Sequence, residues 1–271
     1  MKLIDCFMYF NDDVVLDIRL NTLDKYVDFF VIAEATLDHA GNKKKLNFNK
    51  QKFVKFKDKI KYLVVEDLPQ NTGFFKKNWH SAHIRDQFQR NSLERGYKHF
   101  NDDDLIMISD IDEIPNPKKI SEFEIKNKYA CFIQKNFQAK LNNLNITESN
   151  WLGTKICQKK FLKSPQWLRN IKTKKRKIWA FYKQKEPQII LDGGWHFSFL
   201  KESKLIKQKI ESFAHQEFNQ GNLTNLENIK KRIKSGVDIF ERPFQYKKID
   251  LNNDFPEYIL NNKSKFKDWI L

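Results

Sequence analysis

Short apolar runs alternate with amphipathic stretches along the first half of the chain, a pattern typical of α/β proteins. The apolar runs predict strands at residues 3–10, 27–35, 60–66 and 105–108. The amphipathic stretches predict helices at residues 13–24 and 79–96, and we expect Gly96 to end the second helix. Strands that alternate with helices in this order favour a mostly parallel central sheet flanked by crossover helices.

The second half of the chain has a more mixed pattern. It predicts strands at residues 129–138, 178–182, 188–191 and 195–200, and helices at 201–218, at 225–235 and within 255–271. Glycine and proline number only 8 and 7, and no stretch has the composition of a flexible linker. We therefore expect a single α/β domain over residues 1–271, with two functional halves.

Carboxylates follow one buried strand directly. The apolar run Leu105–Ile108 leads into Asp110 and Asp112, and Pro115 ends the segment. If the backbone stays extended, the two aspartates face the same side at the carboxyl end of a strand, where α/β sheets bind ligands. Adjacent carboxylates repel unless a cation joins them, and Mg²⁺ or Mn²⁺ commonly bridges such groups to phosphate. The pattern favours a metal–diphosphate site; a solvated acidic turn is the alternative reading.

The chain carries a net charge of +16, and 40% of its residues are hydrophobic, which predicts a well-packed core. A basic protein can bind nucleic acid, an anionic surface or an anionic substrate. Most of the basic residues are lysine, whereas arginine is the usual reader of bases, so we expect a nucleotide substrate and no nucleic acid. The densest basic cluster, Lys172–Lys177, is interpreted as a solvated loop, with phosphate or lipid contact as the alternative.

The three cysteines, Cys6, Cys131 and Cys157, are odd in number and far apart, which indicates reduced core thiols in a cytoplasmic protein. The sequence has no signal-peptide pattern and no apolar run near the ~20 residues that span a bilayer. We expect a soluble protein whose lysine-rich surface allows peripheral contact with an anionic membrane. The sequence leaves the oligomeric state open.

Six phrases, in order along nearly the whole chain, resemble glycosyltransferase family 17. They are Ile4–Phe7 with Phe10–Asp12, Ile18–Asn21, Phe30–Ala35, Ile108–Pro115, Gly193–Ser198 and Ser212–Glu217. The resemblance implies a GT-A-like nucleotide-diphospho-sugar transferase fold and an inverting, metal-dependent transfer from a UDP-sugar. UDP-N-acetylglucosamine is the favoured donor, as in β-1,4-N-acetylglucosaminyltransferases. Residues 1–115 would form the nucleotide-sugar half and residues 116–271 the acceptor half.

The resemblance also implies an acceptor class. The sequence opens without the membrane anchor and stem of the eukaryotic members of the family. We therefore expect a microbial glycan, glycolipid or polysaccharide as the acceptor, in place of an N-glycan. A related donor sugar would also be compatible with this pattern.

The resemblance assigns metal-binding roles by position. Asp110 and Asp112 match the DxD position, where Mn²⁺ or Mg²⁺ is held against the donor diphosphate. We expect Asp112 to bind the metal directly, and Asp110 to share it or contact the ribose. His196, within Gly193–Ser198, would complete the metal shell through a neutral imidazole, and the adjacent glycines would allow close approach to a ligand.

The remaining candidates surround the nucleotide-sugar. Glu34 at a strand end would bind ribose or uracil; its alternative is capping the next loop. Asn11 and Asp12 would flank the nucleotide, although Asp12 can instead cap a helix. Arg85, Arg90 and Asn91 would contact phosphate or base unless they form a solvated helix face, and Trp195 would stack on a sugar unless it is core.

Inverting transfer also needs a carboxylate base near the acceptor hydroxyl. The candidates are Asp192, on the glycine turn before His196, then Glu113 and Glu217. Glu113 can otherwise support its neighbours or cap the turn that follows.

Two other functions fit parts of the pattern. A haloacid-dehalogenase-type phosphotransferase also places D-x-D after a strand, with Asp110 as nucleophile, but that motif normally lies near the N-terminus and Ile114 replaces its usual Thr or Val. A basic nucleic-acid-binding protein would explain the charge, and would bind with a steep salt dependence.

Overall fold

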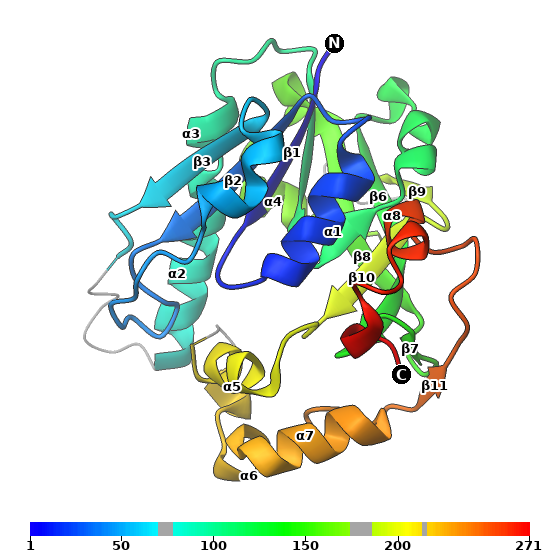
Figure 1. The fold of residues 1–271 in the computed structure, drawn as a ribbon. Coiled ribbons are helices and arrows are strands. Elements are labelled where there is room, and N and C mark those ends of the chain that lie inside the picture. The colour runs from blue at the N-terminus through cyan, green and yellow to red at the C-terminus, as the bar shows by residue number, and fades with distance from the viewer. Residues whose placement is uncertain (70–77, 174–185, 213–215) are drawn as a thin grey trace, which may run out of the picture.

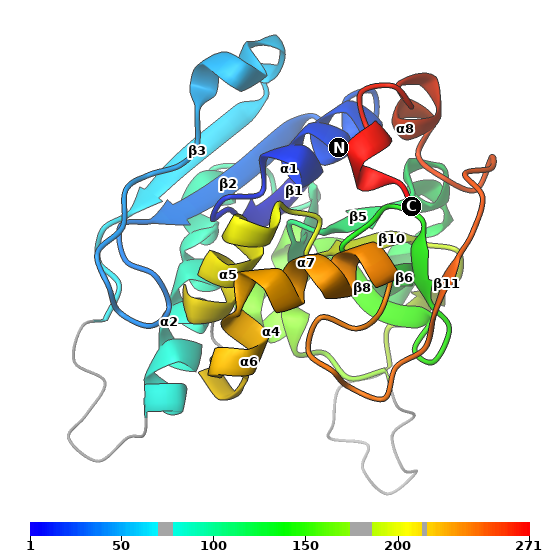
Figure 2. The ribbon, with the colours of Figure 1, turned by 60° about the horizontal axis from the view of Figure 1, so that its bottom comes forward.

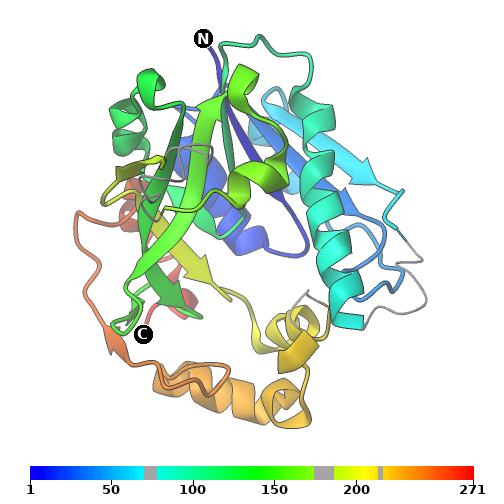
Figure 3. The ribbon, with the colours of Figure 1, turned by 180° about the vertical axis from the view of Figure 1, so that it is seen from behind.

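The computed structural model describes residues 1–69, 78–173, 186–212 and 216–271. Its centre is one sheet with helices on both faces (Figures 1 and 3). The strands are β1 Leu3–Met8, β2 Phe29–Ala35, β3 Ile60–Val65, β4 Leu105–Asp110, β5 Glu113–Pro115, β6 Tyr129–Gln138, β7 Asn143–Asn145, β8 Asn150–Gln158, β9 Gln188–Ile190, β10 Gly194–Ser198 and β11 Tyr246–Lys248.

The helices are mostly short. The α-helices are α1 Asp13–Leu23, α2 Asn78–Ser92, α3 Glu94–Tyr97, α4 Pro165–Arg169, α5 Ser203–Ser212, α6 Gly221–Thr224, α7 Leu226–Ser235 and α8 Glu257–Asn261. The 3₁₀ segments are η1 Lys50–Phe56, η2 Pro117–Glu122, η3 Ile125–Asn127, η4 Lys159–Phe161, η6 Gln216–Phe218 and η7 Lys267–Trp269.

The first half of the chain forms the parallel part of the sheet. β1 pairs in parallel with β2 on one side and β4 on the other, and β3 lies outside β2. Leu3 and Phe7 of β1 pack in the apolar cluster shared with α1 and α8, whereas Ile4 and Cys6 pack in the cluster shared with α3 and α4. Because both faces are covered, these strands read as nearly continuous apolar runs, which is why the sequence predicts them well.

The second half departs from the predicted parallel sheet. β8 pairs antiparallel with both β4 and β6, and β7 and β11 extend the sheet in antiparallel order. β10 lies parallel to β6 and antiparallel to β5. The prediction of a mostly parallel sheet is wrong here, because β6, β7 and β8 follow one another through connections too short for a crossover.

Most other predicted elements are confirmed, with shifts at their ends. The predicted helix at 201–218 is shorter, since α5 ends at Ser212 and Gln216–Phe218 forms a 3₁₀ turn. The predicted strand at 178–182 and most of the Lys172–Lys177 cluster lie outside the described residues. The three cysteines are buried free thiols, as predicted. Within the part of the chain that is described, no helix has both the length and the apolar character needed to cross a membrane.

Three helices lie across one end of the sheet. Figures 1 and 2 show α5, α6 and α7 beyond the end at which β1, β2 and β4 finish. A small separate apolar cluster holds this layer together, with Ile206 and Ile210 of α5 packed near Ile229 of α7 and Phe240. The layer therefore borders the carboxyl edge of the parallel strands, the usual ligand-binding edge of such sheets.

Gly96 lies inside α3 and does not end the preceding helix, so that prediction is wrong. A Cβ at this position would come within 2.4 Å of Cγ1 of Val31 on β2 and within 3.3 Å of Leu63 on β3. Glycine is thus required for the close packing of α3 on the sheet.

Gly96→Ala should therefore destabilise the protein by about 1–3 kcal/mol, because the added methyl overpacks a buried contact. Gly221→Ala is the matched control, since a Cβ there meets no heavy atom within 4 Å and alanine is favoured in helices. Urea unfolding compares the two variants with wild type. Equal stability of the two variants would contradict the packing explanation.

Candidate functional site

A cavity of about 630 Å³ lies at the carboxyl end of the parallel strands. Its lining comes from both halves of the chain: strand ends, α2, β8, β10, α5 and the segment before β11. The residues used below are Asp12, Asp38, His39, Asp86, Gln89, Arg90, Asp110, Asp112, Asn136, Glu148, Trp151, Arg169, His196, Lys209, Phe244 and Tyr246. A concave site with a few converging polar groups is the usual form of a small-molecule site.

Arg19 of α1 is fully buried behind the loop that follows β4. Its guanidinium binds both oxygens of Asp5 on β1, at 2.7 and 2.8 Å. It also donates to the carbonyl oxygens of Asp110, Ile111 and Glu113 at 2.9 to 3.0 Å. A buried guanidinium needs this matching set of acceptors, so Arg19 holds the loop in one conformation.

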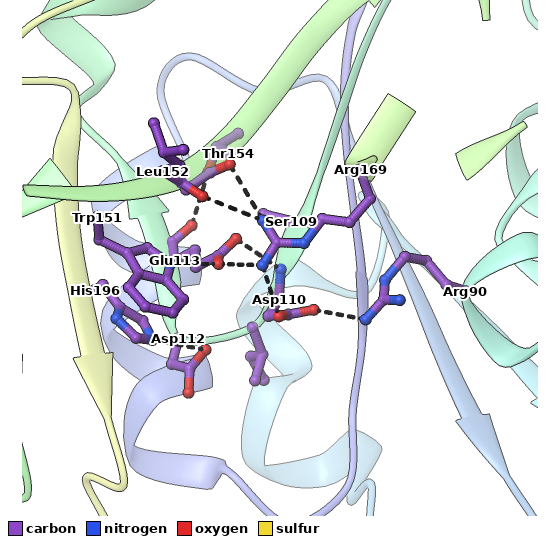
Figure 4. Close-up of polar contacts among 12 residues, drawn as sticks. Arg90, Ser109, Asp110, Asp112, Glu113, Trp151, Leu152, Thr154, Arg169 and His196 are labelled. Atoms are coloured by element: carbon purple, nitrogen blue, oxygen red, sulfur yellow. Dashed lines mark hydrogen bonds and ion pairs between the residues drawn. The ribbon is translucent and has the colours of Figure 1, made fainter. Parts of the chain in front are cut away.

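The loop after β4 is not extended, which corrects the sequence-based expectation. The chain turns at Ile111 and Asp112 before β5 begins at Glu113. Figure 4 shows the consequence: Asp110 reaches toward two arginines, whereas Asp112 lies beside His196. The two aspartates do not form a matched pair on one strand face, because three carbonyl groups of this loop converge on Arg19.

Asp110 is held between Arg90 of α2 and Arg169 of α4, each bonded to a different carboxylate oxygen at 3.0 Å. Burial alone would raise the pKa of Asp110, but the charges of Arg169 and Arg90 hold it well below its usual range. The fully buried Glu113 accepts from Arg169, from Nε1 of Trp151 at 2.7 Å and from the backbone N–H of Asp110 at 3.1 Å. Protein donors occupy both carboxylates, so both fix the loop, and Asp110 also borders the cavity.

Asp112 and His196 line the cavity side by side. Nε2 of His196 lies 3.8 Å from Oδ1 of Asp112, and the imidazole stacks on Trp151 with ring centroids 4.3 Å apart. Nδ1 lies 3.0 Å from the amide oxygen of Asn136, which favours a proton on Nδ1 and a lone pair on Nε2. Burial lowers the pKa of His196 to about 4, although Asp112 and Asp110 act in the opposite direction. The imidazole is therefore neutral at pH 7.

This pair fits a divalent metal in its chemistry. A neutral imidazole nitrogen and a carboxylate oxygen are ligands that Mn²⁺ and Mg²⁺ accept. In the described part of the chain, no group of three or more His, Cys, Asp or Glu side chains is placed to hold a metal. Asp112 and His196 would thus hold a metal only together with oxygens from a bound ligand or from water.

Two lysines next to this pair neutralise its acidic surroundings. Oδ1 of Asp12 lies 2.9 Å from Nζ of Lys201 and 3.4 Å from Nζ of Lys209, and Lys209 also lies 3.5 Å from Oδ2 of Asp112. Burial would raise the pKa of Asp12, but the two ammonium groups lower it to about 2. Asp12 precedes α1 without a capping side-chain hydrogen bond, so its carboxylate serves this charge cluster.

The glycines before His196 serve the protein's own backbone. A Cβ on Gly194, whose φ is +137°, would lie 2.1 Å from the carbonyl oxygen of Ile114 on β5. A Cβ on Gly193 would lie 2.7 Å from Cβ of Phe132 on β6. The glycines therefore let β10 insert between β5 and β6, and this insertion, not a close approach to a ligand, places His196 next to Asp112.

Glu34 caps the loop that follows β2 and does not have the expected position for binding ribose or uracil. It is fully buried and does not line the cavity. Its carboxylate accepts from Nζ of Lys44, the hydroxyl of Tyr62 and the backbone N–H groups of Asn47 and Phe48. Glu34 therefore anchors the loop that follows β2.

Three more nucleotide candidates also hold protein segments. Arg85 donates to the carbonyl oxygens of Pro69 and His39 at 3.0 and 3.1 Å. Asn91 accepts from the backbone N–H of Gln166 in α4. Neither Arg85, Asn91 nor Asn11 is among the described residues that line the cavity; the carbonyl oxygen of Asn11 accepts from Lys201.

The remaining candidates lie away from the cavity. Trp195 is buried in the core and donates Nε1–H to the carbonyl oxygen of Asp254. Asp192 is exposed on its turn, and Glu217 is exposed in a 3₁₀ segment. Neither Asp192 nor Glu217 is among the described residues that line the cavity, so the structure gives neither a position next to Asp112 and His196.

Sequence reasoning missed Arg19, Arg169, Trp151 and Lys209 as site residues. Arg19 carries a signal, because it interrupts the apolar run of α1 and a buried charge must have a partner. Trp151 and Arg169 lie on β8 and α4, two elements that the sequence does not predict. Lys209 lies among the polar residues of α5, where nothing in the sequence distinguishes it.

Comparison with known proteins agrees with the geometry. The model of glycosyltransferase family 17 matches residues 1–268, and this range contains every described residue that lines the cavity. The match confirms the resemblance seen in the six sequence phrases. A search of curated proteins finds none that matches the chain.

Arg19→Met should cost about 3–5 kcal/mol of stability, because it leaves Asp5 charged and buried without a partner. Chemical denaturation measures the loss. The double variant Asp5→Leu with Arg19→Met should recover part of it, since no unpaired charge remains. A loss below about 1 kcal/mol for the single variant would show that the loop does not depend on Arg19.

The imidazole of His196 should remain neutral from pH 8 down to about pH 5, since burial lowers its pKa to about 4. An NMR titration of the histidine ring resonances, assigned with His196→Gln, measures the midpoint. A midpoint at the ordinary histidine value of about 6.5 would contradict the buried environment described above.

Proposed function

This chain belongs to glycosyltransferase family 17, and from that membership we propose that it is an inverting, metal-dependent sugar transferase. It would move N-acetylglucosamine, or a related sugar, from a UDP-sugar to a hydroxyl of a glycan, glycolipid or polysaccharide. The observation that supports this best is the Asp112–His196 pair, 3.8 Å apart, which faces a cavity at the carboxyl edge of the parallel strands. A bound diphosphate would supply the oxygens that this pair lacks as a metal site.

Asp112 and His196 would hold the Mn²⁺ or Mg²⁺, and Asp110 would not. When bound, the cation supplies positive charge that stabilises the departing diphosphate. Lys209 lies 3.5 Å from Asp112 and lines the cavity, and in this proposal its ammonium group would donate to the same anionic leaving group. Arg90 and Arg169 hold Asp110, and through it the loop that carries Asp112.

The nucleoside would occupy the end of the cavity near α2. His39 and Gln89 line that end, with Nε2 of His39 2.9 Å from Oε1 of Gln89. Asp86 lies on the same helix and also lines the cavity. In this proposal they replace the nucleotide contacts expected from the sequence. Glu34, Arg85 and Asn91 are not used, because their side chains bind backbone groups of the protein itself.

The competing phosphotransferase reading has little geometric support. It requires Asp110 to present a carboxylate oxygen to a phosphoryl group. Both oxygens of Asp110 already accept from arginines, at 3.0 Å each. The nucleic-acid reading is also weakened, because many aromatic side chains, such as Phe7, Phe132 and Phe137, lie in the core.

The direct test is to incubate the purified chain with UDP-N-acetylglucosamine and Mn²⁺ and to measure UDP release. Calorimetry of UDP binding with and without a chelator measures the role of the metal separately. We expect UDP binding that depends on the metal, and slow UDP release even with water as acceptor. Absence of metal-dependent binding for every common UDP-sugar would contradict the proposal.

Asp112→Asn should lower turnover by about 100-fold or more, because it removes a charged ligand from the proposed metal. Asp103→Asn is the matched control: Asp103 lies at the opposite end of β4, where it pairs with Lys160. Turnover and thermal unfolding are measured for both variants. Near-normal turnover in a folded Asp112→Asn variant would refute the metal role.

A further inference from the structure

Six carboxylate side chains of the described residues line the cavity, and most have protein partners. They are Asp12, Asp38, Asp86, Asp110, Asp112 and Glu148. Asp12 and Asp112 face lysines, and Asp110 is bonded to two arginines. Asp86 pairs with Arg90 at 2.7 Å, and Asp38 accepts from the backbone and side-chain amides of Asn42 at 2.8 and 3.1 Å.

Glu148 differs from the other five. Its side chain is exposed to the cavity, and its carboxylate makes no hydrogen bond or ion pair with the residues that the structure describes. Its backbone, in contrast, is held firmly. The N–H of Glu148 donates to Oδ1 of Asn145 at 2.9 Å, and its carbonyl oxygen accepts from Nδ2 of Asn136 at 3.0 Å.

The same amide side chain that holds Glu148 also orients His196. Oδ1 of Asn136 lies 3.0 Å from Nδ1 of His196, and the two residues are neighbours on the paired strands β6 and β10. One buried side chain therefore links the backbone of Glu148 to the Asp112–His196 pair. The backbone from which the Glu148 side chain extends is thus fixed relative to the Asp112–His196 pair.

The turn that carries Glu148 lies next to the part of the cavity that is lined by the second half of the chain. The segment before β11 braces it, since the N–H of Gln245 donates to Oγ1 of Thr147 at 2.9 Å. Phe244, from this segment, and Tyr246, the first residue of β11, line the cavity with partly exposed rings. Aromatic surface of this kind can bury the apolar face of a sugar ring, so this side suits the acceptor.

We propose that Glu148 is the general base of the transfer, an inference that rests on the proposed function. Glu148 takes the proton of the acceptor hydroxyl as that oxygen forms a bond to C1 of the donor sugar. The bond from C1 to the diphosphate oxygen breaks, and its electron pair leaves with UDP. The proton then passes from Glu148 to water, so the products are the glycoside, UDP and one proton.

The partners of the other carboxylates favour this choice. A base must accept a proton during the reaction, and a carboxylate bonded to an arginine or lysine is stabilised in its charged form and accepts one poorly. Of the six described cavity carboxylates, only Asp38 and Glu148 have no such partner in the described residues, and Asp38 accepts two hydrogen bonds from Asn42 whereas the carboxylate of Glu148 accepts none. The sequence candidates Asp192 and Glu217 do not line the cavity, and Glu113 is buried under protein donors.

The test uses the full chain with UDP-N-acetylglucosamine and Mn²⁺, with water or the best of a panel of p-nitrophenyl glycosides as acceptor. Glu148→Gln should lower turnover by about 10²- to 10⁴-fold and leave the affinity for UDP unchanged. Glu148→Ala should lose as much and regain activity with added formate, a small carboxylate that fits the vacated space. Glu257→Gln, an exposed residue of α8 outside the cavity lining, should behave as wild type.

Three results would overturn the assignment. Near-normal turnover of Glu148→Gln beside an active wild type would remove Glu148 as base and leave the proposed function intact. Loss of UDP affinity in step with turnover, or no recovery with formate, would show a structural or binding role instead. A wild-type chain that neither binds nor turns over any UDP-sugar would refute the proposed function and this inference together.

Discussion

The charge of Arg19, buried without contact with water, is the constraint on which the site depends. One side chain of α1 binds Asp5 on β1, the hydroxyl of Ser109 on β4 and three carbonyl oxygens between the end of β4 and the start of β5. Leaving such a charge unpaired would cost several kcal/mol. In the native loop these carbonyl groups therefore point toward α1. This loop conformation determines the direction of each acidic side chain.

The loop between β4 and β5 separates its acidic residues into two groups with different roles. Asp110 and Glu113 share Arg169, and protein donors occupy both carboxylates, so they keep the loop rigid. Asp112 is left on the cavity side with His196, and Lys209 is the nearby cation. A rigid first group supporting an available second group is the arrangement expected of a site that must hold a ligand in one geometry.

The sequence predicts the parallel part of the fold because strands buried on both faces are apolar throughout, as Ile4 and Phe7 illustrate. It does not predict β8, whose residues lack a clear alternation of apolar and polar side chains. The family resemblance assigns Asp112 and His196 to one metal site, whereas the spacing of these residues in the sequence does not predict it. Glu34 could not be resolved from the sequence, because a carboxylate that caps a loop and one that binds ribose look the same there. Arg169 reaches Asp110 across 59 residues, and only the tertiary fold reveals that contact.

The central claim is that the loop held by Arg19 offers Asp112, and not Asp110, to a metal-bound diphosphate. Anomalous X-ray scattering from crystals of the chain grown with Mn²⁺ and UDP tests this directly. The account predicts one manganese peak within bonding distance of Asp112 and His196, with Asp110 still held by Arg90 and Arg169. A peak bridging Asp110 and Asp112, with the two arginines displaced, would contradict it.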